Sequence, residues 1–429
     1  MNKVVNFISS SILCLIPAAL LTGPFLPDLF ISFLALFFLI FTISNKKYFY
    51  YNNIYFKFFI LFCIYFIIGS YFSENPRLSF SSSLFYFRFG LFVLMTKYLL
   101  ENNKNLPKYF YYFLLATVLV VCFDGYYQFF FGNNILGFKI PTENRLSGFF
   151  NKEAILGSYL SKLFFLLIAL HFIVNKKYSK FYNIFFWIMI ISIFLLIFLS
   201  GERASFFQTV LGIIVCFIFL NYKFKYKIYC FSTVLILVIA LSNIFEKNSQ
   251  RMFNETISQI NILVFKITDK NDQRISNYIK DKSIASSLAT NQHKEHFKAA
   301  YSMFIDKPIF GYGLKMFREI CGKEKYNTSI YSCTTHPHNS YLQILAEAGF
   351  IGFFFLFIPL MSIFFIFAKY LFIRNSKLYI SNTSVCLLSF YLMVLWPITT
   401  NGNLFGNWLS VMYFLPAGFY LFYKKSDRI

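Results

Sequence analysis

Residues 336–352 read HPHNSYLQILAEAGFIG. A long hydrophilic segment ends here and a very apolar helix begins, so this stretch lies at a boundary between water and lipid. Two histidines and an asparagine occupy the polar side of the boundary. The ordinary pKa of an imidazole lies close to neutral pH, which makes His338 a candidate to accept a proton from an attacking hydroxyl.

The composition places the chain among polytopic membrane proteins. Hydrophobic residues make up 58% of the 429 residues and charged residues only 14%, a balance typical of chains with many membrane spans. The first apolar stretch follows Lys3, and no small-residue cleavage site comes after it. We therefore expect a retained first span instead of a removed signal peptide.

Apolar stretches long enough to cross roughly 30 Å of hydrocarbon recur about twelve times. Pro24 and Pro27 leave little linker between the first two, which also suit a single re-entrant hairpin. The predicted spans are residues 4–22, 25–44, 54–72, 80–99, 109–131, 153–174, 181–199, 204–221, 228–244, 342–368, 378–397 and 404–423. Arg88, Asp124 and Lys162 lie in or near these spans, and we expect them to pair within the bundle.

The net charge of +22 is mainly a signal of membrane orientation. Every second connection is rich in lysine: Lys46, Lys47 and Lys57; Lys104 and Lys108; Lys176, Lys177 and Lys180; Lys223, Lys225 and Lys227; Arg374 and Lys377; Lys424, Lys425 and Arg428. By the positive-inside rule these connections and both termini are cytoplasmic. Nucleic acid is therefore not expected as a partner.

This orientation predicts three parts: N-terminal spans over 1–244, an outer loop over 245–341 and C-terminal spans over 342–429. The outer loop is the only hydrophilic stretch large enough to fold. Its run HKEHFKAAYSMFI (293–305) predicts a helix that ends at 306–308, followed by a tight turn at 311–313. One face of that helix is predicted to carry Phe297, Ala300, Tyr301 and Phe304.

Cys321 and Cys333 both lie in the outer loop. An oxidising compartment permits a disulfide between them, the alternative being two free thiols. The bridge would stabilise the loop by roughly 3 kcal/mol. It would also hold the segment that leads into His338.

Arginines and histidines on the outer side are the candidate site residues. A charge near hydrocarbon is costly unless it is paired or hydrated, and the planar fork of an arginine suits phosphate oxygens. The candidates are Arg77, Arg145, Arg203, Arg274, Arg318, His336 and His338. Structural alternatives stay open: Arg203 paired with Glu202 at the interface, Arg77 capping a helix or paired with Glu74, and Arg145, Arg274 and Arg318 on solvated faces.

The histidines also have structural alternatives. Asn339 is well placed to cap the helix that begins at Ser340, which would give the His338 segment a structural role. Pro337 predicts an extended backbone in which the two neighbouring imidazoles point in different directions. His293 and His296 share a helix face, but without an HExxH pattern a zinc site with His336 and His338 is not favoured.

The chain resembles the O-antigen ligase and O-antigen polymerase superfamily of bacterial envelope glycan transferases. The resemblance is carried by HPHNSYLQILAEAGFIGF (336–353), KAAYSMFIDKPIFGYGLKMFREIC (298–321), SGERASF (200–206) and NRLSGFFNKEAILGSYL (144–160). It is supported by the number of spans and by one dominant outer loop late in the chain. The ligase-like region is expected over about 140–365.

The resemblance implies an all-α polytopic membrane protein with a C-type glycosyltransferase-like fold and one helical periplasmic loop domain. It implies a location in the bacterial inner membrane and a donor glycan on undecaprenyl diphosphate. By the same resemblance His338 is the essential histidine, and Arg203 and Arg145 are essential arginines. Arg274, then Arg318, is expected as a substrate-binding arginine, with Arg77, His336 and Asn339 as further binding candidates.

The predicted reaction is an inverting glycosyl transfer at the periplasmic face. The arginines hold the diphosphate, and His338 takes the proton of the acceptor hydroxyl. Since cationic side chains supply the stabilisation, we expect neither a metal nor a cofactor. The single large loop favours transfer to lipid A–core by a ligase; a polymerase that extends a lipid-linked repeat is the alternative. A flippase is less favoured because no internal repeat is apparent and the charged candidates lie at one face.

Overall fold

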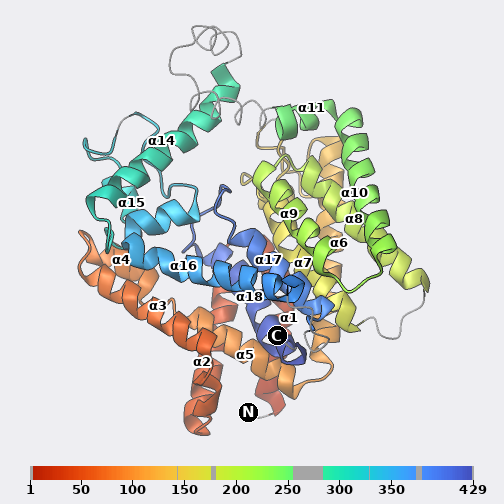
Figure 1. Cartoon of the computed structure of the whole chain (residues 1–429), viewed down its shortest axis with the longest axis horizontal. Coiled ribbons are helices and arrows are strands. Elements are labelled where there is room, and N and C mark those ends of the chain that lie inside the picture. Colours follow the sequence, from red (N-terminus) through yellow and green to blue (C-terminus); the bar gives the residue numbers. More distant parts are fainter. Residues whose placement is uncertain are drawn as a thin grey trace.

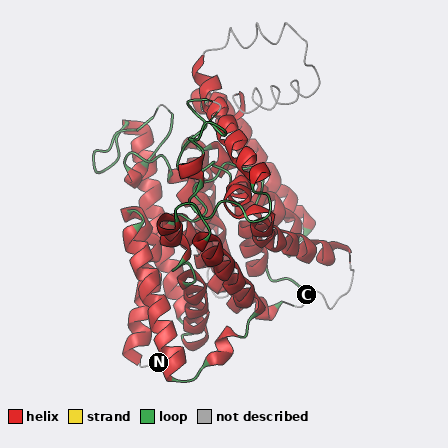
Figure 2. Ribbon diagram, turned by 90° about the vertical axis from the view of Figure 1, so that its left-hand side faces the viewer, coloured by secondary structure: helices red, strands yellow, loops and turns green. Residues whose placement is uncertain are grey.

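The computed structural model describes residues 3–142, 144–174, 180–254, 284–327, 329–372 and 379–427. Within these ranges the chain forms helices joined by loops and has no strand (Figure 2). The all-α class is thus as predicted.

Each of the twelve predicted apolar stretches contains helix. The helices are α1 (Lys3–Ala19), α2 (Phe25–Ser44), α3 (Ile54–Tyr71), α4 (Pro76–Ser83), α5 (Arg88–Asn102), α6 (Leu106–Phe131), α7 (Leu156–Val174), α8 (Lys180–Leu199), α9 (Arg203–Phe219), α10 (Phe224–Ile244), α16 (Ser340–Phe372), α17 (Asn382–Val394) and α18 (Asn407–Tyr423). In the described ranges nine helical segments are long and apolar enough to cross a membrane, with α4 and α5 counted together, and α9 and α17 are shorter apolar helices. The protein is therefore a polytopic membrane protein by composition and helix length, and twelve spans stay a prediction.

Local sequence explains where several of these helices begin and end. Asn53 caps α3 by accepting the N–H of Tyr55 at 2.9 Å. Asn75 accepts the N–H of Leu78 at 3.2 Å, and Pro76 then occupies the first turn of α4. Gly132, with φ of 79°, ends α6 in the left-handed conformation that favours glycine.

The hydrophobic core is built around α7, which packs against α6, α8, α9 and α17. Figure 1 shows α3, α4, α14 and α15 on one side of the molecule and α8, α9, α10 and α11 on the other. Helix α5 packs between α2 and α18. This bundle supports the segments that carry the candidate site.

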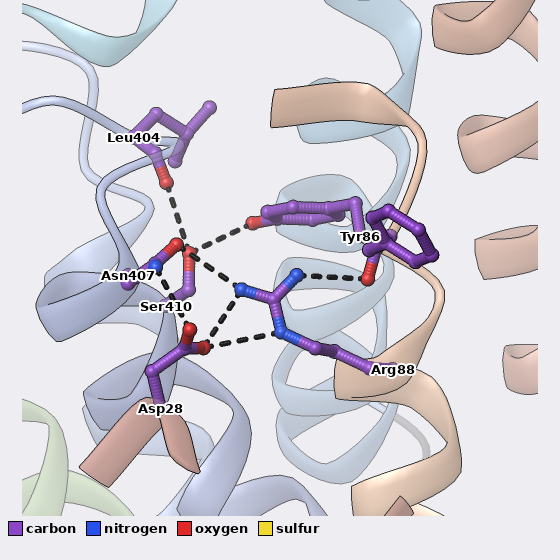
Figure 3. A network of polar contacts seen from close by, with 7 residues as sticks. Asp28, Tyr86, Arg88, Leu404, Asn407 and Ser410 are labelled. Atoms are coloured by element: carbon purple, nitrogen blue, oxygen red, sulfur yellow. Dashed lines mark hydrogen bonds and ion pairs between the residues drawn. The ribbon is translucent and has the colours of Figure 1, made fainter. Parts of the chain in front are cut away.

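A polar network joins α2, α5 and α18 (Figure 3). Arg88 donates to Asp28 Oδ1 from Nη2 at 2.7 Å and from Nε at 3.1 Å. Its Nη1 donates to the carbonyl of Phe85, and its Nη2 also reaches Asn407 Oδ1 at 3.2 Å. Asn407 in turn donates to Asp28 Oδ2 at 3.0 Å. The pairing expected for Arg88 is therefore present, with Asp28 as its partner.

The segment predicted to form the outer loop holds α11 (Glu246–Ser249), a π-helix over Gln250–Asn254, α14 (Ile284–Asp306) and α15 (Phe317–Ile320). It has a core of its own, formed by Ala299, Ala300, Met303, Tyr312, Met316, Phe317, Ile320, Cys321, Tyr326 and Ala346. Helix α14 ends at Asp306, as predicted. Its predicted apolar face is wrong in part, because Tyr301 is 55% exposed while Ala299 and Met303 are buried.

Two glycine turns dock this region on α16. The N–H groups of Tyr312 and Gly313 donate to the carbonyls of Ala346 and Glu347 at 3.2 and 2.7 Å. A Cβ at Gly311 (φ 69°) would lie 2.4 Å from the backbone of Glu347, so only glycine allows this approach. Gly349 (φ 64°, ψ −164°) kinks α16 at the same place. The sequence predicts a continuous span here and misses the kink.

Candidate active site

His338 lies in the segment that leads into α16, with the left-handed φ of 57° that is uncommon for histidine. Its carbonyl accepts the N–H of Asn401 at 2.8 Å. Asn339 accepts the N–H groups of Tyr341 and Leu342, both at 3.0 Å. It also donates to the carbonyls of Pro397 and Thr399. Asn339 is buried and acts here as a helix cap, the structural alternative that the sequence left open.

Four histidines gather at this point. The ring of His338 lies 4.2 Å from His336, 5.0 Å from His293 and 5.5 Å from His296, measured between ring centroids. The prediction that Pro337 separates the two neighbouring imidazoles is wrong. The left-handed backbone at His338 turns its ring back toward His336.

Burial lowers the pKa of all four imidazoles, and nearby positive charge adds to this at His293, His336 and His338. Burial, followed by the charges of His336, His293 and His296, lowers the pKa of His338 to about 3. Burial and the nearby Arg318 lower the pKa of His336 to about 4. The pKa values of His293 and His296 are also lowered, chiefly by burial, and His293 is further affected by Arg203. Neutral rings can accept protons or bind metal ions.

The Arg203 turn is held by Glu202. This carboxylate accepts the N–H groups of Gly157 and Ser158 at 2.6 and 3.2 Å and the hydroxyl of Ser205 at 3.2 Å. Burial raises its pKa, while the charges of Arg145 and Lys162 act in the opposite direction. Glu202 therefore ties the start of α7 to the start of α9. The next residue, Arg203, lies near enough to His293 for its charge to lower the pKa of that imidazole.

Arg145 lies beside the same turn. Leu146 donates its N–H to the carbonyl of Ser200 at 3.2 Å, and Gly201 lies directly against the backbone of Asn144. The guanidinium of Arg145 donates from Nη2 to the carbonyl of Ala154 at 2.9 Å. Its Nε is buried and has no hydrogen-bond partner among the described residues. Arg145 Nε is thus available to donate a hydrogen bond to a ligand.

Arg318 lies on α15 close to the cluster, and its charge lowers the pKa of His336. Its Nε is also buried without a partner in the part of the chain that the structure describes. A disulfide joins Cys321 and Cys333, the two cysteines paired in the sequence analysis, with 5.0 Å between their Cα atoms. The bridge ties α15 to the segment before His336.

Of the other two predicted arginines, Arg77 is described by the structure and Arg274 is not. Arg77 is exposed on α4, and Glu74, considered as its partner, pairs with Lys323 at 2.5 Å. Arg274 lies outside the described residues. Its predicted role stays a prediction.

A further arginine, which no sequence motif marks, also reaches the turn. Arg251, in the π-helix, donates from Nε to the carbonyl of Gly201 at 2.9 Å. Nothing in the local sequence of Arg251 marks it, because its partner lies 50 positions away in the chain. A π-helical turn is rare and is often found at functional sites.

Comparison with known families identifies residues 184–357 as matching the family described as O-antigen ligase. The matched segment contains Arg203, Arg318 and all four clustered histidines, and it ends within α16. No curated protein matches the chain. The family match confirms, for residues 184–357, the resemblance to the O-antigen ligase superfamily that the sequence predicts.

Proposed function

We propose that the protein is a glycan ligase of the bacterial inner membrane. It transfers a glycan from undecaprenyl diphosphate to a sugar hydroxyl of lipid A–core at the periplasmic face. The observation that carries this proposal is the gathering of four histidines, with Arg203 near His293 and Arg318 near His336, inside the segment that matches the O-antigen ligase family.

The arginines are the proposed diphosphate ligands. Arg145 and Arg318 each keep a buried Nε donor without a protein acceptor among the described residues. A buried donor without a hydrogen bond costs free energy. A ligand that accepts a hydrogen bond from it therefore gains affinity. A planar guanidinium can bind phosphate oxygens with two parallel hydrogen bonds. Arg203, which lies next in sequence to the Glu202 anchor, is held in position to join them.

His338 is the proposed general base. With a pKa of about 3 its ring is neutral at pH 7 but weakly basic. A bound diphosphate places negative charge near the ring, which favours the protonated imidazole and raises its pKa. The base therefore gains strength when the donor is bound, and this limits wasteful reaction in its absence.

The chemical step follows from these roles. The acceptor hydroxyl oxygen attacks the anomeric carbon as the bond from that carbon to the diphosphate oxygen breaks. The hydroxyl proton passes to His338, and undecaprenyl diphosphate leaves with the bonding electrons. A single displacement inverts the anomeric carbon, and the arginines stabilise the charge that develops on the leaving group. We propose no metal ion in this step, because the guanidinium groups supply the stabilisation.

A polymerase that joins lipid-linked repeat units is the alternative, since it needs the same donor site. One large outer segment, instead of two, favours the ligase. Transport of a lipid-linked glycan is less well supported, because the candidate residues lie at helix starts and in loops instead of midway along the spans.

Complementation tests the proposal. Wild-type protein is expressed in a ligase-deficient strain and, separately, in a polymerase-deficient strain that makes a matching donor glycan, and lipopolysaccharide is resolved on gels. We expect long chains on lipid A–core in the first strain only. Rescue of the polymerase-deficient strain alone would identify the acceptor as a lipid-linked repeat. Activity of the purified protein that is lost in chelator and restored by a divalent ion would contradict the metal-free step.

A further inference from the structure

We propose that His293, His296 and His338 form a binding site for one transition-metal ion such as Zn²⁺, and that this ion inhibits the enzyme. One ring nitrogen from each histidine lies within 4.8 Å of the others. Metal binding itself is independent of the proposed reaction, whereas inhibition rests on His338 acting as its base.

The backbone supplies this arrangement from two distant segments. His293 and His296 are three positions apart on α14, so they lie on one face, one turn apart. His338 comes from the segment before α16, and its left-handed backbone turns the ring toward α14. A tetrahedral zinc site has Zn–N distances of about 2.0–2.1 Å, which puts the nitrogens about 3.4 Å apart. The three rings need to close by at most about 1.4 Å to meet this geometry.

Two of the three ligand histidines have a buried nitrogen without a hydrogen-bond partner among the described residues. Nδ1 of His293 and Nδ1 of His296 are both buried, and neither has a hydrogen-bond partner in the described ranges. The carbonyls of Tyr331 and Ser332 interact with the His296 ring, so they face its other nitrogen, Nε2. A metal-binding histidine commonly donates its second N–H to a carbonyl in this way, which fixes the ring.

The donor set determines the kind of ion. Three imidazoles without a carboxylate favour Zn²⁺, Cu²⁺, Ni²⁺ or Co²⁺ over Mg²⁺ and Ca²⁺. His336, whose ring lies 4.2 Å from that of His338, or a water molecule can take the fourth position. The Arg203 charge near His293 opposes a cation, so we expect reversible binding instead of a permanent structural ion.

Occupation would have a direct chemical consequence. The lone pair that accepts the hydroxyl proton would be engaged by the metal, so His338 could no longer act as a base. The ion would also place positive charge beside the arginines and hold α14 against the segment that precedes α16. Zinc and a substrate hydroxyl would thus compete for one nitrogen atom.

The test uses the purified full-length protein in detergent. Binding is measured with Co²⁺ by its visible absorption and with Zn²⁺ by competition against a chromophoric chelator. The variants are His293→Ala, His296→Ala and, as a control on an exposed position of the same helix, Lys294→Ala. Circular dichroism and elution volume confirm that each variant is folded. Wild type and Lys294→Ala should bind one ion per chain, and each histidine variant at least tenfold more weakly.

Equal binding by folded histidine variants and wild type, or no binding by wild type, would overturn the metal site. Transfer activity is measured in the same preparations with added Zn²⁺ and then with chelator. Inhibition of wild type that chelator reverses, and weaker inhibition of His296→Ala, is the expected result. Zinc bound at the histidines without any inhibition would overturn the inhibition and contradict His338 as the base, while the metal site itself would stand.

Discussion

Arg88 and Arg145 are both partly buried arginines, but their surroundings differ in kind. Arg88 is surrounded by acceptors: Asp28, Asn407 and the carbonyl of Phe85 (Figure 3). Arg145 makes one hydrogen bond to a carbonyl and keeps a buried Nε without a partner in the described part of the chain. We expect an arginine whose three nitrogens all have acceptors to stabilise the fold, and one with an unpaired buried donor to be a candidate for binding a ligand.

The same contrast extends to the regions around them. At the α2–α5–α18 junction, polar groups pair with one another. At the other region, four histidines gather close to Arg203 and Arg318, and the carboxylate beside Arg203, Glu202, is already used to hold the start of α7. The first region should therefore control stability, and the second should control activity.

The largest effect is expected from His338→Ala. Loss of a general base lowers the rate by roughly 10²–10⁴-fold, and transfer of glycan from a lipid-linked donor by the purified variant measures this. Its amount in the membrane should match wild type. Full activity of the folded variant would remove His338 from the mechanism.

Arg203→Ala should lower the rate by roughly 10²–10³-fold, as expected for one group that stabilises developing charge. Arg203→Lys keeps the charge but not the fork of donors, so we expect it to recover only part of the activity. Steady-state kinetics with varied donor concentration provides the measurement. If both variants fail to fold, Arg203 has a structural role like that of Arg88, and the proposed difference between the two regions is wrong.

Replacement of both Cys321 and Cys333 by serine should lower the free energy of unfolding by roughly 3 kcal/mol. The bridge closes a short loop between α15 and the His336 segment, so activity should fall with stability near the unfolding temperature. Thermal unfolding with and without reductant measures the effect. A wild-type protein that is insensitive to reductant, while its thiols become accessible, would contradict this role.

Arg88→Ala should lower the free energy of unfolding by about 2 kcal/mol, because it leaves a partly buried Asp28 without its cation. The activity of the folded fraction should stay unchanged. Asp28→Asn in the Arg88→Ala background should recover part of the loss, as a thermal shift assay can show. A loss of specific activity without loss of stability would place Arg88 on the functional side of the comparison.

The smallest effect concerns pH. The lowered pKa values of His336 and His338, about 4 and 3, mean that the unfolded chain binds more protons than the folded chain below about pH 6.5. Above about pH 6.5 the two states bind the same number of protons at these rings. As the pH falls toward 4, proton uptake by the unfolded chain lowers the free energy of unfolding. The melting temperature of His336→Ala should therefore fall less steeply between pH 6.5 and 4 than that of wild type. Parallel curves would show that the ring is not held neutral.

The sequence predicts a good part of this molecule. The length of the apolar stretches alone identifies every stretch that holds a bundle helix. In lipid the backbone N–H and C=O groups must be hydrogen-bonded within the protein, and a helix is the structure that achieves this within a single segment. The sequence also identifies the helix around 293–305, its end at Asp306 and the pair Cys321 and Cys333. Arginine and histidine stand out on the outer side because other charges are sparse there.

By itself, then, the sequence determined the helical class, the hydrophilic segment that precedes α16 and the kinds of side chain available for chemistry. Only the tertiary structure decided which of them meet. It joined His293 and His296 to His338 across more than 40 positions, turned His336 and His338 toward each other, paired Arg88 with Asp28 and brought Arg251 to Gly201. These contacts depend on helix packing, on the kink at Gly349 and on the left-handed backbone at His338. None of these is encoded in local hydrophobic periodicity, because each arises where segments distant in the chain pack together.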